Sequence, residues 1–450
     1  MKTLIRGGLV VDPANKTERI TNVLFENGRV ADVTDLVPDA DMIFDAAGMT
    51  VTPGFIDIHM HEDRYFPKED RFEEAIAPCM LRMGVTTMLG GNCGSNRYDP
   101  GVYLDAADRL GTASNIALLA GHSTLRALSC SRGKYEAATA DEIRKMQYAA
   151  EKWLALGCAG ISYGIRYVPG STEEELCATA KACAAAGKMA AAHIRDDAAF
   201  VFDAAEEFLR ITTAAGCRAE VSHIGSMAGF GQMRDFLTLL EKKRREGIPV
   251  YADCYPYAAF STEIGETTYD DGFLERYGTD YSAIEICEGP YKGMRCTEEI
   301  FRELRKSFPD TLTVCRVMKP EDIELALLDP EVTIGSDGIL SGMQGHPRAA
   351  GSFPKYLREY VQSGKLPLSE GIAKLTSLPA ERIGLKDRGS FTRGNAADAV
   401  VFDPASVRDC ATFDNPVLPP EGIRAVFVNG ILACENGTVL TTHAGKAVRI

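Results

Sequence analysis

The feature that most constrains the fold is an alternation of short apolar segments with longer helical segments, from about residue 54 to about residue 385. Helical stretches such as DEIRKMQYAAEKWLALG (141–157) separate segments rich in Val, Ile and Ala. Such alternation is typical of a parallel sheet covered by helices. Eight candidate strands can be counted, and eight strands close a TIM-type (β/α)8 barrel.

The two ends of the chain follow a different pattern, with short strands bounded by Gly and Asn-Gly turns in residues 1–53 and 386–450. We expect these ends to pair into one small β-sandwich domain, so that residues 54–385 form a continuous barrel domain. Residues 263–330, between the seventh and eighth strands, are rich in Tyr, Gly and acidic residues. Their position favours a lid-like insertion over the site.

The charge balance excludes some classes of partner. The chain has 49 Lys and Arg against 63 Asp and Glu, a net charge of −14, which disfavours nucleic acid and anionic membranes. Thirteen cysteines without a small-domain framework, and an N-terminus without a signal-like apolar stretch, indicate reduced thiols and a cytoplasmic location. We expect a small-molecule substrate; no motif indicates the oligomeric state, and a homo-oligomer stays open.

Histidines gather at the predicted strand ends. Four of the seven His lie there, and a carboxylate follows the eighth strand: His59, His61, His193, His223 and Asp337. Catalytic groups of TIM barrels sit at these ends of the strands. The i, i+2 spacing of His59 and His61 places both imidazoles on one side of a strand, where they can share a metal. Alone, the pair could be two core histidines; four converging His and a carboxylate favour a metal site.

Cys93 in GGNCG differs from the twelve other cysteines, which are more simply interpreted as small buried hydrophobic residues. It stands between Gly and Asn at a predicted strand end, where a thiolate could face a metal. We therefore predict that Cys93 is a ligand. Asp337 in Ser-Asp-Gly could be a turn residue, but its position after the eighth strand favours the site.

A series of motifs carries a family resemblance. In order, GFIDIHMH, GNCG, YVPG, HIR, SHIG, DCYPYAAFST, SDG and HPR resemble the D-aminoacylase (N-acyl-D-amino-acid deacylase) branch of the amidohydrolase superfamily. The resemblance covers essentially the whole chain, because RGSFTRGNAADAVVFDP looks like the re-entry of such enzymes into their β-domain.

The resemblance implies a tightly held zinc on Cys93, His193 and His223, and a weaker second site on His59, His61 and Asp337. In this branch the Cys stands where many relatives have a carboxylated lysine. Here the fourth strand offers Tyr163 and no Lys, which disfavours dihydropyrimidinase-like and urease-like relatives.

The expected reaction follows from these ligands. Three protein groups on zinc leave an open position for water, whose pKa falls to about 7, and the resulting hydroxide attacks the amide. Asp337 would accept the proton of that water and deliver it to the leaving nitrogen. The resemblance implies that the substrate is an N-acyl-D-amino acid.

Further residues match family positions that contact the substrate. Arg348 of HPR would clamp the substrate carboxylate with its planar guanidinium, and Tyr163, Tyr255 and Ser261 would line the pocket or hydrogen-bond the substrate. Each of these residue types is also common in structural roles.

One position departs from the family pattern. The family usually carries a Lys two residues after the second zinc-binding His, and here that position is Gly225. Losing one cationic contact weakens carboxylate recognition by roughly 1.5 to 3 kcal/mol. Either Arg348 suffices, the insertion supplies Lys292 or Arg316, or the substrate is not a simple N-acyl-amino acid.

Two other classes of function stay open. The same metal site would also open a cyclic amide, such as a hydantoin or lactam, or deaminate a ring. A barrel that has lost its chemistry and serves as a scaffold is disfavoured by the intact ligand set. Metal content distinguishes this scaffold from the two hydrolases.

Overall fold

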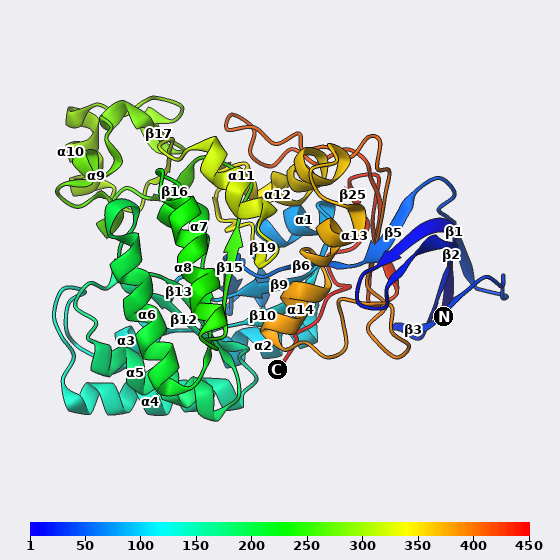
Figure 1. Ribbon diagram of the computed structural model, residues 1–450, viewed down its shortest axis with the longest axis horizontal. Coiled ribbons are helices and arrows are strands. Elements are labelled where there is room, and N and C mark those ends of the chain that lie inside the picture. Colours follow the sequence, from blue (N-terminus) through cyan, green and yellow to red (C-terminus); the bar gives the residue numbers. More distant parts are fainter.

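In the computed structural model, which describes residues 1–450, eight parallel strands form a barrel surrounded by helices (Figure 1). These strands are β6 (Phe55–Asp57), β9 (Val85–Gly90), β10 (Asn115–Leu118), β12 (Gly160–Gly164), β13 (Met189–His193), β14 (Arg218–Val221), β15 (Val250–Cys254) and β19 (Val332–Ile334). The short β11 (Ala120–Gly121) continues β10 and pairs with β12. The ring closes where Met60 bridges Gly338 and where the Asp337 amide donates to the His59 carbonyl at 2.7 Å. The predicted TIM-type barrel is confirmed.

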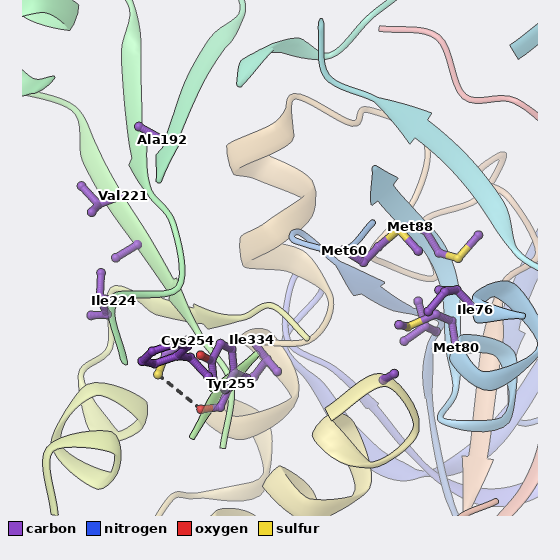
Figure 2. Close-up of a cluster of buried hydrophobic side chains, with 14 of the residues drawn as sticks. Met60, Ile76, Met80, Met88, Ala192, Val221, Ile224, Cys254, Tyr255 and Ile334 are labelled. Carbon is purple, nitrogen blue, oxygen red and sulfur yellow. Dashed lines mark hydrogen bonds between the residues drawn. The ribbon is translucent and has the colours of Figure 1, made fainter. Parts of the chain in front are cut away.

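Consecutive residues of the strands belong to two different apolar cores, as alternation along a strand requires. Leu89 and Ala191 belong to a small cluster that also holds Ile383, whereas their neighbours Met88 and Ala192 belong to the large cluster shared with the helices. Figure 2 shows part of the large cluster, with side chains from β9, β13, β14, β15, β19 and the first helix. In strands such as β9 and β13, one face therefore belongs to the small cluster and the other packs against the helical layer.

The helical layer follows the strands in sequence. Its main helices are α1 (Ile76–Arg82), α2 (Pro100–Leu110), α3 (His122–Ser129), α4 (Ala140–Ala155), α5 (Glu173–Ala185), α6 (Val201–Ala215), α7 (Ile224–Ala228), α8 (Met233–Arg245), α11 (Pro320–Leu328), α12 (Arg348–Tyr356), α13 (Leu368–Ala373) and α14 (Ser377–Ile383). Local sequence sets their ends. Thr139 and Glu142 form a capping box at the start of α4, and Gly216 ends α6 in the left-handed conformation.

Both ends of the chain contribute to one nine-stranded sheet. Its strands are β1 (Lys2–Asp12), β2 (Thr17–Glu26), β3 (Arg29–Thr34), β4 (Met42–Asp45), β5 (Thr50–Pro53), β22 (Ala399–Phe402), β23 (Ile423–Val428), β24 (Ile431–Glu435) and β25 (Thr438–Val439). The two ends join where β5 pairs antiparallel with β22. Phe25 and Phe427 are separated by three strands of the sheet, yet their ring centroids lie 6.1 Å apart. The sheet therefore curls over its own core, as a sandwich does.

Between β15 and β19 the chain forms a small separate unit. It contains the antiparallel strands β16 (Phe260–Glu263), β17 (Ile284–Ile286) and β18 (Leu312–Cys315), with α9 (Phe273–Tyr277) and α10 (Glu298–Ser307). An aromatic cluster holds it together, with the ring centroids of Phe273 and Phe301 5.2 Å apart. Figure 1 shows this unit projecting from one end of the barrel. We call it the insertion.

Two further observations concern the whole chain. All thirteen cysteines are free thiols. None of the helices combines the length and the apolar composition that crossing a membrane requires.

Candidate active site and metal centre

The six candidate metal ligands lie together at the ends of the barrel strands. The first, His59, and the last, Asp337, are 278 residues apart in the sequence. They form two groups that share Cys93, namely Cys93 with His193 and His223, and Cys93 with His59, His61 and Asp337. Within each group the ligand atoms all lie within 4.8 Å of one another. Atoms this close can be bound by one metal ion or by two neighbouring ions.

Cys93 stands between the two groups. Its Sγ lies 3.4 Å from His223 Nε2 and 3.5 Å from His59 Nε2. On the second side, Asp337 Oδ1 lies 3.2 Å from His61 Nε2 and 3.5 Å from His59 Nε2. All of these side chains except that of His61 are buried. The Cys93 thiol is thus the one group that belongs to both sets of candidate metal ligands.

Three of the candidate ligands have left-handed backbone conformations. The φ angles of Cys93, His223 and Asp337 are 51°, 35° and 49°, values that side chains other than Gly rarely adopt. Each such residue costs on the order of 1–3 kcal/mol and persists only where surrounding contacts fix it. Here the Asp337 amide donates to His59 at 2.7 Å and the His223 amide donates to Asp253 at 2.9 Å. Strain concentrated at one site is typical of a functional site.

Two neighbours orient the imidazoles. Asp253 Oδ2 lies 3.3 Å from His59 Nδ1, while its Oδ1 accepts the His223 amide. Ser226 Oγ lies 2.9 Å from His223 Nδ1 and also donates to the His223 carbonyl. Engaging Nδ1 in this way leaves Nε2 of both rings free to face Cys93. No sequence motif identifies either role, although Asp253 lies next to the last residue of β15.

The electrostatic environment favours the metal-binding forms of Cys93, Asp337 and His193. It does not favour that of His59, because burial lowers its pKa but the charges of Asp253 and Cys93 outweigh burial and raise it well above its usual value. Burial alone would raise the pKa of the Cys93 thiol, but the His223 and His59 imidazoles hold it well below its usual value. Burial acts upward on the Asp337 pKa too, and Arg348 and His61 outweigh it, so that this pKa lies well below its usual range. Burial lowers the pKa of His193 and so favours its neutral form. A thiolate, a carboxylate and a neutral imidazole are the forms that bind metals.

The donor set itself identifies the kind of metal it suits. One thiolate with two imidazoles is a set that zinc prefers, and three protein ligands leave a fourth position open, as in catalytic zinc sites. His59, His61 and Asp337 add two imidazoles and a carboxylate on the other side of Cys93. The residues present therefore fit zinc.

A cavity of about 320 Å³ opens onto this site. Its walls include His61, Cys93, His193, His223 and Asp337 from the barrel, and Phe260, Ser261, Glu263, Glu266 and Leu312 from the insertion and the strands flanking it. The barrel supplies the inner end of the cavity and the insertion supplies part of its outer wall. A small molecule of the size of an acylated amino acid fits a cavity of this size.

Arg348 lies at the inner end of the cavity and is only 1% exposed. Its Nη1 is 2.8 Å from Asp337 Oδ2, its Nη2 donates to the Ser261 carbonyl at 3.4 Å, and its guanidinium lies 4.7 Å from the Tyr255 ring centroid. His346 accepts the Arg348 amide at 3.0 Å. These contacts bring Arg348, Ser261 and Tyr255 together beside Asp337, with Arg348 and Ser261 on the cavity wall.

The prediction that Tyr163 contacts the substrate is wrong. Its side chain does not reach the cavity, because it lies in the outer core and its hydroxyl donates to the Leu176 carbonyl of α5 at 3.2 Å. Tyr167, one turn further along the chain, lines the cavity instead, with its ring centroid 4.6 Å from that of His193. The chain turns inward after β12, which the strand pattern alone did not reveal.

The cations suggested as replacements for the missing lysine are also excluded. Neither Lys292 nor Arg316 lines the cavity, and Arg316 is paired with Glu285 at 2.7 Å. At Gly225 a Cβ would lie 2.9 Å from Ile323 Cδ1 and 3.0 Å from Cys254 Sγ. The position of the absent lysine is therefore enclosed by apolar neighbours, so any second cation must come from elsewhere.

Comparisons with known proteins agree with this site. Models described as "Amidohydrolase family" match residues 50–229 and 321–432. The chain is 32% identical to a D-aminoacylase of Alcaligenes xylosoxydans xylosoxydans, over 99% of this chain and 97% of that protein. It is 31% identical to an N-acyl-D-glutamate deacylase of the same organism, over 95% of this chain and 92% of that protein.

Solved structures give the same result. The N-acyl-D-glutamate deacylase of Bordetella bronchiseptica, complexed with zinc and a phosphonate inhibitor, is 29% identical, with a TM-score of 0.89 over 100% of this chain and 99% of that chain. A D-hydantoinase structure is only 15% identical, with a TM-score of 0.61, and shares the fold alone. With its barrel, its two-ended β-domain and full-length relatives of this kind, the chain belongs to the D-aminoacylase branch of the amidohydrolase superfamily.

Proposed function

We propose that the protein is a zinc-dependent hydrolase that removes the acyl group from N-acyl-D-amino acids. The observation that carries the proposal is the placement of Cys93, His193 and His223 within 4.8 Å of one another in a cavity that also holds Asp337 and Arg348. This arrangement combines a zinc donor set, a carboxylate that can move a proton and a cation that can bind the substrate carboxylate.

Cys93, His193 and His223 would hold the tightly bound zinc, and His59, His61 and Asp337 would form the weaker second site. When bound, the metal supplies a Lewis acid that lowers the pKa of water and polarises the amide carbonyl. Asp253 and Ser226 would keep the two rings in place through His59 Nδ1 and His223 Nδ1.

Asp337 would carry the proton. Its carboxylate accepts the proton of the attacking water and delivers it to the amide nitrogen as the C–N bond breaks, so that the leaving group departs as a neutral amine. The ion pair between Asp337 and Arg348 fixes one carboxylate oxygen and leaves Oδ1 on the side of His61 and His59. Asp337 is thus held in the orientation that both proton transfers require.

The α-carboxylate of the substrate would bind at Arg348. A guanidinium has five N–H donors in a planar fork, so Arg348 can hold Asp337 with one edge and still donate to a second carboxylate. Ser261 lines the cavity beside the guanidinium and would complete this subsite. Tyr255 does not line the cavity and would act only by packing its ring against the guanidinium. The D configuration rests on the relatives, which are named as a D-aminoacylase and an N-acyl-D-glutamate deacylase.

The test is amine release by the zinc-loaded protein from matched N-acetyl-D- and N-acetyl-L-amino acids, together with hydantoins. We expect amine release from D substrates only, and loss of this activity in Asp337→Asn. Ring opening of a hydantoin without amide hydrolysis, or equal activity on both enantiomers, would contradict the proposal.

A further inference from the structure

The cavity contains one cation without a protein partner. Three basic side chains line it, namely Arg97, Lys134 and Arg348. Arg348 pairs with Asp337 at 2.8 Å, and Lys134 lies 3.9 Å from Glu266. Arg97 forms a hydrogen bond only through its main chain, whereas its guanidinium has neither a hydrogen bond nor an ion pair.

The loop that carries Arg97 is firmly anchored, so the free guanidinium is not the result of a loose segment. Glu62 accepts the Arg97 amide at 2.9 Å with one carboxylate oxygen and the Gly91 amide at 2.7 Å with the other. The side chain of Asn96 donates to Leu119 at 2.9 Å and accepts from Gly121 at 2.7 Å. The main chain at Arg97 is therefore fixed while its side chain stays available.

Arg97 and Arg348 stand at different depths. Arg348 is 1% exposed and lies beside Asp337, at what we call the floor of the cavity. Arg97 is partly exposed and also lines two neighbouring surface hollows, both of which contain Arg64. We call the outer part of the cavity, lined by Arg97, Lys134, Glu263 and Glu266, the rim. Arg348 and Arg97 thus line the same cavity, one as a buried side chain and the other as a partly exposed one.

Most of the carboxylates that line the cavity have a hydrogen-bond or ion-pair partner. Asp197 accepts from the Tyr277 hydroxyl at 2.7 Å and lies 3.0 Å from Arg276, and Glu266 faces Lys134. Glu263 alone has no partner for its carboxylate; burial and the charge of Glu266 raise its pKa, and Arg97 acts in the opposite direction. The rim thus holds one free guanidinium close enough to one free carboxyl for their charges to interact.

We infer that the substrate carries a second anionic group, distal to its α-carboxylate, and that Arg97 receives this group. The inference rests on the proposed function and narrows its substrate class to dianionic N-acyl-D-amino acids. The second group belongs either to the side chain, as in an acidic amino acid, or to the acyl part, as in a succinyl group. A guanidinium binds either carboxylate with the same paired N–H donors.

The test compares three substrates of the zinc-loaded enzyme: the dianionic N-acetyl-D-glutamate and N-succinyl-D-alanine, and N-acetyl-D-methionine, which carries only the α-carboxylate. In Arg97→Gln we expect KM to rise about tenfold or more for one dianionic substrate and to stay unchanged for N-acetyl-D-methionine. The dianionic substrate that is affected identifies where the second group lies. An equal change for all three substrates, or no change for any, would overturn the inference.

Glu263→Gln is the matched control, because it removes the opposite charge from the same rim. We expect this variant to lower KM for the same dianionic substrate and to leave KM for the monoanionic N-acetyl-D-methionine unchanged. A rise in KM for the dianionic substrate in Glu263→Gln would contradict the assignment, since a nearby negative charge repels the ligand.

A binding measurement with ligands that cannot be hydrolysed tests this inference independently of the proposed function. Glutarate and butyrate have similar chains and differ in one carboxylate, and their affinity for zinc-loaded protein can be measured by calorimetry. We expect glutarate to bind more tightly, and Arg97→Gln to remove the difference. If hydrolysis fails but this difference appears, the proposed reaction is wrong and the anion site stands. If hydrolysis of D substrates occurs without this difference, only the inference is overturned.

Discussion

The floor and the rim of the cavity are built in different ways. At the floor, Cys93 and Asp337 are each 7% exposed and His223 is 2% exposed, and all three have strained backbones fixed by neighbouring contacts. At the rim, Arg97 and Glu263 are partly exposed, and neither side chain has a partner. Several contacts therefore fix each of these floor residues, whereas these two rim side chains have no hydrogen-bond or ion-pair partner.

This difference shows which part of the site can change its specificity. A metal-ligand residue such as His223 is held in place by hydrogen bonds with Asp253 and Ser226. Substituting His223 therefore disturbs several groups at once. The guanidinium of a rim residue such as Arg97 has neither a hydrogen bond nor an ion pair, so replacing it removes no such contact from the floor. Floor residues should therefore govern the rate of the reaction, and rim residues should govern which substrates bind. Variants of each group can test this division.

Metal removal should have the largest effect. Dialysis against a chelator should abolish amine release, and added zinc should restore it, because the metal lowers the pKa of the attacking water and polarises the amide carbonyl. Cys93→Ala should lose zinc and activity together. Cys130→Ala, at a partly exposed thiol, is the control and should keep both. Metal content measured beside activity checks the prediction, and full activity in zinc-free protein would contradict it.

Asp337→Asn should reduce kcat by roughly 10²–10⁴-fold, because the amide cannot accept the proton that the carboxylate carries. Zinc bound through Cys93 should remain, since Asp337 belongs to the other group of ligands. The measurement is kcat at saturating substrate, with zinc content and thermal stability as controls. A kcat near that of the wild type would exclude Asp337 as the proton carrier.

Arg348→Lys should raise KM by about tenfold or more for N-acetyl-D-methionine, because an ammonium lacks the planar fork that holds two carboxylates. This rise in KM should appear for monoanionic and dianionic substrates alike, because both carry the α-carboxylate, whereas the effect of Arg97→Gln should not. Steady-state KM for both substrate types is the measurement. An unchanged KM would remove Arg348 from the α-carboxylate subsite.

Gly225→Lys should have the smallest effect on the reaction and should not improve substrate binding. A Cβ at this position meets Ile323 and Cys254 at 2.9 Å and 3.0 Å, so we expect the free energy of unfolding to fall by about 1–3 kcal/mol. Gly133→Ala, whose Cβ would lie 3.5 Å from its nearest neighbour, is the control in a denaturant titration with Gly225→Ala. A lowered KM in Gly225→Lys would show that the lysine position is still usable.

The sequence predicts the floor well and the rim poorly, for a physical reason. The strands of the barrel end at one edge, so chemistry-bearing residues at strand ends, such as His59 and His193, must converge. Tyr163 was misassigned because alternation along β12 directs it outward, while Tyr167 reaches the cavity after a turn. Arg97 lies in a loop without a motif, and only the three-dimensional structure shows that its guanidinium is free.

The most direct test of the central claim is a crystal structure of the zinc-loaded protein with anomalous scattering measured at the zinc edge. We expect a peak at about 2.0–2.3 Å from Cys93 Sγ and from ring nitrogens of His193 and His223. An active protein whose anomalous peak lies away from Cys93 would show that this residue does not bind the catalytic zinc.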